Sequence, residues 1–111
     1  MNTLLVTVLL CACSTADPGT ETSTETLIID VRTAQEYDSG HIDGALNIPY
    51  DVIEARIAEV TTDKDREIVV YCGSGRRSGI ALKTLTQMGY KQVVNEGGYE
   101  AYRKRRLKIN D

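Results

Sequence analysis

The sequence predicts an α/β fold in which helices cover both faces of a central parallel sheet. Two short runs rich in β-branched residues, 26–31 and 67–71, are typical of buried strands. A helical pattern follows each run, and this alternation favours parallel pairing, because every crossover helix returns over a face of the sheet. With 111 residues, 41% of them hydrophobic, the chain has room for one small domain.

The first residues are typical of a targeting leader. Residues 4–10 are apolar, but they are too few to cross a bilayer as a helix, and no positively charged residue precedes them. Residues 10–13 are similar to the cleavage box of bacterial lipoproteins, whose last Cys carries the lipid. We therefore expect the leader to end at Cys13 and Cys13 to be lipidated. A plain leader cleaved near Ala12 or Ala16 is the alternative.

A tether and one folded domain are expected after the leader of residues 1–13. Residues 14–25 are mostly Thr, Ser and Glu and have no apolar periodicity, which is typical of a disordered segment. The domain would then span residues 26–111. A lipoprotein leader implies that this domain is periplasmic and is held at the membrane by its lipid.

The first half of the domain shows clear signals for one strand and one helix. Strand 26–31 is followed by Thr33 and Glu36, which match a capping box and predict a short helix that ends at Gly40. Residues 41–49 would hold a loop and a brief strand. A further helix is expected after this segment, with three apolar residues on one face. These residues are Ile53, Ile57 and Val60.

The second half of the domain repeats the pattern after a polar turn at 61–65. Beyond strand 67–71, a helix is expected to end at Gly89, which would form a left-handed cap. Its apolar residues are Ile80, Ala81, Leu82, Leu85 and Met88. Residues 93–94 predict a short strand, Gly97 and Gly98 a turn, and 99–106 a final basic helix.

The loop after strand 67–71 is the candidate site. Cys72 stands at the carboxyl end of a strand and before a helix, which is where ligands bind in open α/β sheets. Backbone amides and the positive end of the helix converge there and should ease ionisation of the thiol. Gly73 and Gly75 permit a tight cradle, and Arg76 and Arg77 place positive charge on its rim. The pattern predicts a thiolate nucleophile that acts on a small anion.

Composition argues against several other kinds of function. Cys11 and Cys13 fall in the leader, so Cys72 is the only thiol expected inside the domain. With His41 as the single histidine, the domain has no metal ligand set, and no P-loop or dinucleotide motif indicates a cofactor. A net charge of −3 gives no reason to expect nucleic-acid binding. The basic C-terminus is a solvated helix face or, alternatively, a surface for an anionic lipid or partner.

Three motifs resemble those of the rhodanese family. Residues 30–37 and 40–49 are similar to the family's opening motif, 72–79 to its active-site loop and 97–102 to its closing motif. They occur in the family's order and cover nearly all of 26–102. The resemblance implies a small rhodanese-like domain, and size and leader are most similar to the periplasmic single-domain form.

This resemblance implies a sulfurtransferase. Cys72 would attack the outer sulfur of thiosulfate or a similar small anionic donor, release sulfite and hold the sulfur as a persulfide. A thiophilic acceptor, such as cyanide or a thiol, would then take the sulfur. The residues expected to bind the donor are Gly73, Ser74, Gly75, Arg76 and Arg77.

Other polar and aromatic residues have supporting roles in this interpretation. Asp30 and Arg32 end the neighbouring strand and either steady the active loop or form an ordinary ion pair with partners such as Glu36. His41 is expected to fix a turn rather than to act in catalysis. The remaining candidates are expected in the core or in the wall of the site. They are Tyr71, Tyr99 and Tyr102.

Two alternative functions remain open at this stage. Phosphatases and arsenate reductases of related fold place one residue more between Cys and the binding Arg than the four that separate Cys72 from Arg77. The shorter loop makes a tighter ring, which favours a single sulfur atom over a tetrahedral oxyanion. A sulfur-carrier or partner-binding module without its own turnover is the second alternative.

Overall fold

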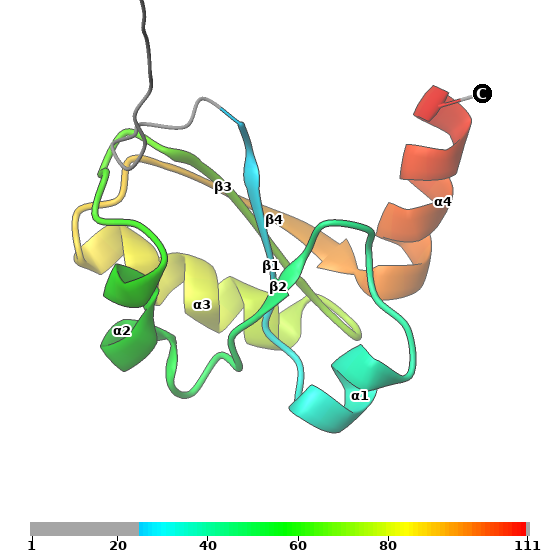
Figure 1. Cartoon of the computed structure of the whole chain (residues 1–111), viewed down its shortest axis with the longest axis horizontal. Coiled ribbons are helices and arrows are strands. Elements are labelled where there is room, and N and C mark those ends of the chain that lie inside the picture. The colour runs from blue at the N-terminus through cyan, green and yellow to red at the C-terminus, as the bar shows by residue number, and fades with distance from the viewer. Residues whose placement is uncertain (1–24, 111) are drawn as a thin grey trace, which may run out of the picture.

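The computed structural model describes residues 25–110, which form a four-stranded sheet with its helices (Figure 1). The predicted leader (1–13), its lipidation site Cys13 and residues 14–24 of the predicted tether lie outside the described residues. In chain order the elements are β1 (Leu27–Asp30), α1 (Ala34–Asp38), β2 (Leu46–Asn47), α2 (Ile53–Arg56), the 3₁₀ helix η2 (Ile57–Glu59), β3 (Glu67–Cys72), α3 (Arg76–Gln87), β4 (Gln92–Gly98) and α4 (Tyr99–Asn110).

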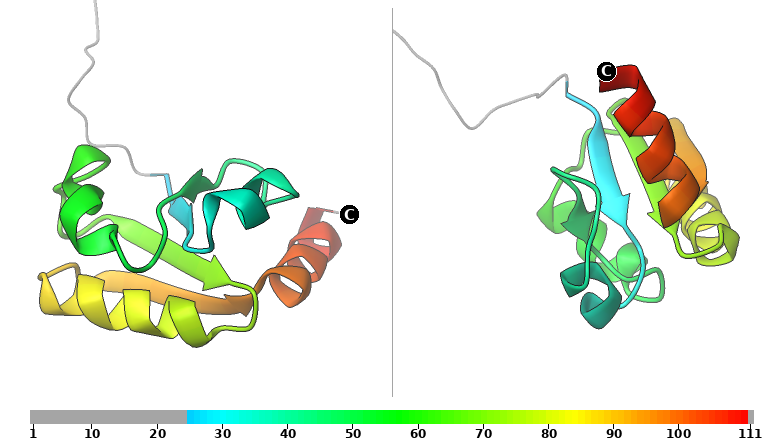
Figure 2. Two further views of the ribbon diagram at one scale, coloured as in Figure 1. Left: turned by 90° about the horizontal axis from the view of Figure 1, so that it is seen from below. Right: turned by 90° about the vertical axis from the view of Figure 1, so that its right-hand side faces the viewer.

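The sheet is parallel throughout, as predicted, with the strand order β2-β1-β3-β4 (Figure 2). β1 lies between two other strands and is buried along its whole length, because both faces of the sheet are covered there. Its last residue, Asp30, pairs with Tyr71, one position before the end of β3. Parallel pairing therefore brings Asp30 and Cys72 to the same edge of the sheet.

The two faces of the sheet carry different cores. One face packs against α2 and α3 and is almost entirely aliphatic, with Ile53, Ile57 and Leu85 fully buried. The other face packs against residues of α1 and α4 and is rich in tyrosine, with Tyr71 and Tyr102 at its centre. The predicted arrangement of helices on both faces is thus correct (Figure 1).

Local signals in the sequence place two helix ends correctly. The Thr33 hydroxyl accepts the Glu36 amide at 3.1 Å, and the Glu36 carboxylate accepts the Thr33 amide at 3.0 Å, which completes the predicted capping box. Gly89 has φ +103° and follows the end of α3, as the predicted left-handed cap requires. Both features need only residues within one helical turn.

The predicted turn at Gly97 and Gly98 is wrong. Both residues belong to β4, which runs well beyond the predicted pair 93–94, and Gly98 pairs with Cys72. A β-bulge between Val70 and Tyr71 leaves one extra residue in β4 before Gly97. Glycine is needed here because a Cβ on Gly98 would lie 2.7 Å from the carbonyl oxygen of Gly73. The end of β4 therefore lies directly against the active loop.

Two residues expected on core faces are instead partly exposed. Val60 is 36% exposed and follows the last residue of η2, whereas Ile57 at the start of η2 is fully buried. Ile80 is 40% exposed, whereas Ala81 on the same helix is buried. The core-facing side of α3 is therefore narrower than the run of apolar residues indicates.

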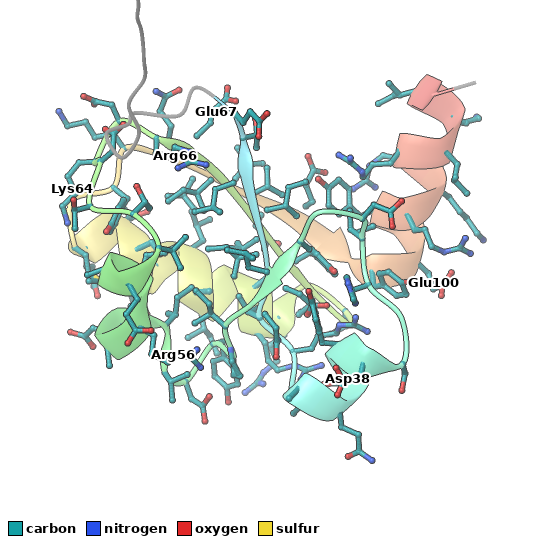
Figure 3. All side chains as sticks on the ribbon, in the orientation of Figure 1. Asp38, Arg56, Lys64, Arg66, Glu67 and Glu100 are labelled. Atoms are coloured by element: carbon teal, nitrogen blue, oxygen red, sulfur yellow. The ribbon has the colours of Figure 1, made fainter. Side chains whose placement is uncertain are left out.

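Helix α4 extends past the predicted end at Arg106 and projects from the sheet on the side away from α2 and α3 (Figure 1). Charged side chains such as Asp38, Lys64 and Glu100 lie at the periphery of the fold (Figure 3). Within residues 25–110, every helix is too short or too polar to cross a bilayer.

Candidate active site

Cys72 is the last residue of β3, and a three-residue loop joins it to the first turn of α3. Its side chain is fully buried, with 0% exposed surface. Gly75 adopts φ +99°, a left-handed conformation that glycine accepts without strain, and so turns the chain sharply back over the sulfur. The sulfur thus sits inside a cup formed by its own loop.

Hydrogen-bond donors converge on this sulfur. The Gly75 amide donates to Sγ at 2.9 Å, and the Ser78 hydroxyl lies 3.4 Å from it. Burial raises the pKa of the Cys72 thiol, but hydrogen bonds from the Ser78 hydroxyl and from the amides of Ser78, Ser74 and Gly75 outweigh it and lower the pKa to about 7. The lowered pKa brings ionisation of the thiol into the range of neutral pH.

The two arginines of the loop are not equivalent. Arg77 donates to both carboxylate oxygens of Glu36, at 2.8 and 3.1 Å, and is only partly exposed. This contact raises the pKa of Arg77, and the neighbouring Cys72 raises it further. Arg76, the first residue of α3, is exposed to solvent.

Glu36 links α1 to the active loop, a role that the sequence does not reveal. The Arg77 guanidinium, followed by the Thr33 amide, lowers the pKa of Glu36 to about 2. The same carboxylate therefore caps α1 and holds the arginine beside Cys72. The capping box is visible in the sequence, but its second contact lies 41 positions away along the chain.

Asp30 and Arg32 pair with each other rather than with Glu36. Their closest contact is 2.6 Å, from Arg32 Nη2 to Asp30 Oδ2, and a second bond joins Nε to Oδ1 at 2.9 Å. Both side chains are buried, and the Asp30 hydrogen bond raises the pKa of Arg32. The guanidinium also lies 4.6 Å from the ring centre of Tyr99 and donates to the Gly40 carbonyl at 2.6 Å. This pair therefore connects the end of β1 to the Gly40 loop and to the first residue of α4.

The remaining predicted residues take structural or surface positions. The His41 ring stacks on Tyr37 at 3.6 Å, and its Nδ1 lies 2.8 Å from the Tyr37 carbonyl, as expected for a residue that fixes a turn. Gly73 and Ser74 are exposed on the loop, where a Cβ on Gly73 would lie 3.2 Å from Arg77 Nη2. Within residues 25–110, His, Cys, Asp and Glu side chains do not gather in threes as a metal site would require.

Asn95 of β4 belongs to the site, although sequence reasoning misses it. Its Oδ1 accepts from the Ser78 hydroxyl at 2.7 Å and from the Gly97 amide at 2.8 Å. Its Nδ2 donates to the Gly75 carbonyl at 3.2 Å. The β4 bulge brings Asn95 into reach of these groups, and a bulge leaves no simple signal in the sequence.

Comparison with known proteins gives a consistent family. The model of the rhodanese-like domain matches residues 18–105. The chain is 46% identical over 70 residues to thiosulfate sulfurtransferase PspE of Escherichia coli K12, covering 63% of this chain and 67% of that one. It is 41% identical over 86 residues to a sulfurtransferase of Allochromatium vinosum, covering 77% and 78%. A solved rhodanese with anions from E. coli superposes with a TM-score of 0.66 at 42% identity, covering 68% and 89%.

Proposed function

This chain belongs to the rhodanese-like domain family, and from that premise we propose that it is a sulfurtransferase that carries a sulfane sulfur on Cys72. One observation carries the proposal. The Cys72 sulfur sits in a cup of amide and hydroxyl donors that lowers the pKa of its thiol to about 7. A thiolate is thus present at neutral pH without a dedicated general base.

The reaction divides into two displacements at sulfur. The Cys72 thiolate attacks the outer sulfur of thiosulfate, a new S–S bond forms, and sulfite leaves with the electron pair of the bond that breaks. A thiol or cyanide then attacks the outer sulfur of the persulfide, and the Cys72 thiolate leaves. No net oxidation of the protein occurs, and no proton needs to cross the loop.

Each neighbouring group has a role in these steps. The Gly75 amide and Ser78 hydroxyl stabilise the sulfur charge, and Arg77 neutralises the anionic donor and the departing sulfite. Arg76, exposed at the start of α3, adds to the attraction of anions. Because Cys72 has no exposed surface, the loop must shift for a donor to contact it, and its glycines make this shift inexpensive.

The location of the protein is proposed from the sequence alone. The leader of residues 1–13 would deliver the domain to the periplasm, with Cys13 as the lipid-bearing residue. Metabolic labelling with a radioactive fatty acid tests this step. Label that is retained in Cys13→Ser protein would contradict the anchor.

Intact-mass spectrometry tests the function directly. The purified protein is mixed with thiosulfate, and we expect a gain of one sulfur mass that disappears when cyanide is added. The Cys72→Ser protein should gain nothing. A wild-type protein that gains no sulfur would contradict the proposal, and hydrolysis of an aryl phosphate in its place would favour a phosphatase. Loading without repeated turnover on any thiol acceptor would favour a sulfur carrier.

A further inference from the structure

The orientation of the Asn95 side chain is determined by two contacts that do not involve the sulfur. Its oxygen accepts the Gly97 amide at 2.8 Å, and its nitrogen donates to the Gly75 carbonyl at 3.2 Å. With the amide held in this way, the oxygen atom faces the Ser78 hydroxyl at 2.7 Å. Asn95 therefore presents an acceptor to Ser78 and cannot supply it with a proton.

Ser78 has one hydroxyl proton and three acceptors within reach. Its Oγ lies 2.7 Å from Asn95 Oδ1, 3.1 Å from the Gly75 carbonyl oxygen and 3.4 Å from Cys72 Sγ. A hydroxyl donates a single proton, so these bonds exclude one another at any moment. The shortest of them runs to Asn95, away from the sulfur.

The charge on Sγ determines which acceptor receives the hydrogen bond from the Ser78 hydroxyl. A thiolate is a strong acceptor, whereas a neutral thiol is a weak one, and hydrogen bonds to ionised groups are about twice as strong as those between neutral groups. In a persulfide the negative charge moves outward to the terminal sulfur, and Sγ again becomes a weak acceptor. During the proposed reaction, Sγ thus alternates between being a strong and a weak hydrogen-bond acceptor.

We propose that Asn95 is a positioning residue that holds the alternative acceptor for Ser78, so that the hydroxyl turns to Asn95 when Sγ is uncharged and to Cys72 when Sγ is a thiolate. This rests on the proposed function for the persulfide half of the cycle. The proton stays bonded to the Ser78 oxygen throughout, and only its direction changes. Neither state leaves the buried hydroxyl proton without an acceptor.

The competition sets the acidity of the thiol. Each Ser78 bond to the thiolate is made at the expense of the bond to Asn95, so Asn95 holds the pKa of the thiol above the value that an uncontested Ser78 bond would give. The charged groups around the loop are separate from this competition. They are Arg77 on α3, Glu36 on α1, the pair Asp30 and Arg32 at the end of β1, and Glu96 on β4, which bonds to Arg105.

The test is a set of four proteins: wild type, Asn95→Leu, Ser78→Ala and the double variant. The rate of alkylation of Cys72 by iodoacetamide is measured against pH, which gives the pKa of the thiol. Asn95→Leu, close to asparagine in shape, should lower this pKa by about half a unit to one unit. In the Ser78→Ala background the same change should have no effect, because no proton is left to compete for.

Asn95→Asp separates this mechanism from simple loosening of the loop. A carboxylate is a stronger acceptor for Ser78 and a like charge near the sulfur, so it should raise the pKa of the thiol by one unit or more. A loosened loop would move both variants in the same direction. A pKa that rises in Asn95→Leu, or that shifts equally in both Ser78 backgrounds, would overturn the proposal. The assay needs no sulfur donor, so its result is independent of the test with thiosulfate.

Discussion

The sheet places two acidic side chains at the ends of neighbouring strands and stabilises them in different ways. Asp30, the last residue of β1, is fully buried and bonded to the guanidinium of Arg32 at 2.6 and 2.9 Å. Cys72, the last residue of β3, is equally buried, but its sulfur faces the Gly75 amide and the Ser78 hydroxyl. The Asp30 carboxylate is thus stabilised by a full counter-charge, whereas the Cys72 thiolate is stabilised mainly by neutral dipoles.

The difference suits the two side chains to different tasks. A buried counter-charge is costly if its partner loses charge, because the remaining ion is then buried without compensation. Dipoles impose no such cost, since amides and hydroxyls need no full charge opposite them. A sulfur that gains and loses a second sulfur, and with it the local charge, is therefore better served by dipoles. The Asp30–Arg32 pair instead gives this end of the sheet a permanent position.

The most disruptive test removes the charge from each position in turn. Asp30→Asn leaves the buried Arg32 without its counter-charge and should lower the free energy of unfolding by about 3–5 kcal/mol. Cys72→Ser leaves neutral dipoles around a small polar group and should cost about 1 kcal/mol. Urea denaturation of both variants measures the two losses. Equal losses would mean that the two positions are stabilised alike.

A substitution that displaces the loop backbone around Cys72, and leaves the Asp30–Arg32 pair in place, sharpens the comparison. Gly98→Ala would place a Cβ 2.7 Å from the Gly73 carbonyl oxygen, so the loop must move. We expect a loss of about 1–3 kcal/mol in the free energy of unfolding and a higher thiol pKa, as the donors shift from the sulfur. Gly79→Ala is the control, because Gly79 lies inside α3 and its Cβ would lie 3.6 Å from Asn95 Nδ2 of β4, an ordinary van der Waals contact. That variant should be as stable as the wild type or more stable. If the thiol pKa of Gly98→Ala equals that of the wild type, the hydrogen-bond donors around the sulfur do not depend on the close contact between Gly98 and Gly73.

The smallest effect is expected at the partly exposed pair of Glu36 and Arg77. The pKa of Glu36 falls from an ordinary 4.5 to about 2 in the folded protein. A lowered carboxyl pKa stabilises the fold above pH 4.5, and this stabilisation is lost as the pH falls from 4.5 to 2. Glu36→Gln should therefore cost about 0.5–1 kcal/mol at pH 7 and nothing near pH 2, as measured by thermal unfolding at both pH values.

Glu100→Gln is the matched control for this pair. Glu100 bonds to Arg103 at 3.0 Å near the start of α4, and both side chains are more exposed than those of Arg77 and Glu36. At pH 7 we expect Glu100→Gln to lose less stability than Glu36→Gln does. The comparison fails if the two variants lose the same stability at both pH values.

Short-range signals made the fold largely predictable. The capping box at Thr33 and the cap at Gly89 depend on residues within one turn, and both are present as expected. The buried strands could be predicted because parallel strands that are covered on both faces are continuously apolar. The turn predicted at Gly97 and Gly98 failed because two glycines also mark a strand that approaches another backbone closely, and no local pattern separates these cases.

The site was less predictable, because its contacts join distant parts of the chain. The position of Cys72 follows from the strand, loop and helix around it. The partners of its loop do not, since Glu36 reaches Arg77 across 41 positions and Asn95 reaches Ser78 across 17. The sequence led us to expect backbone amides around the sulfur, and they are among the groups that lower the pKa of Cys72, but it gave no role to the Ser78 hydroxyl.

The most direct measurement is a titration of the Cys72 thiol in the wild-type protein, followed by its ultraviolet absorbance as a thiolate. The amides and hydroxyl around the sulfur predict a midpoint at about pH 7, with the thiolate fraction rising as the pH rises through that value. A midpoint near 9, the ordinary value for a thiol, would contradict the claim that a cup formed mainly by neutral dipoles holds a buried sulfur in its reactive form.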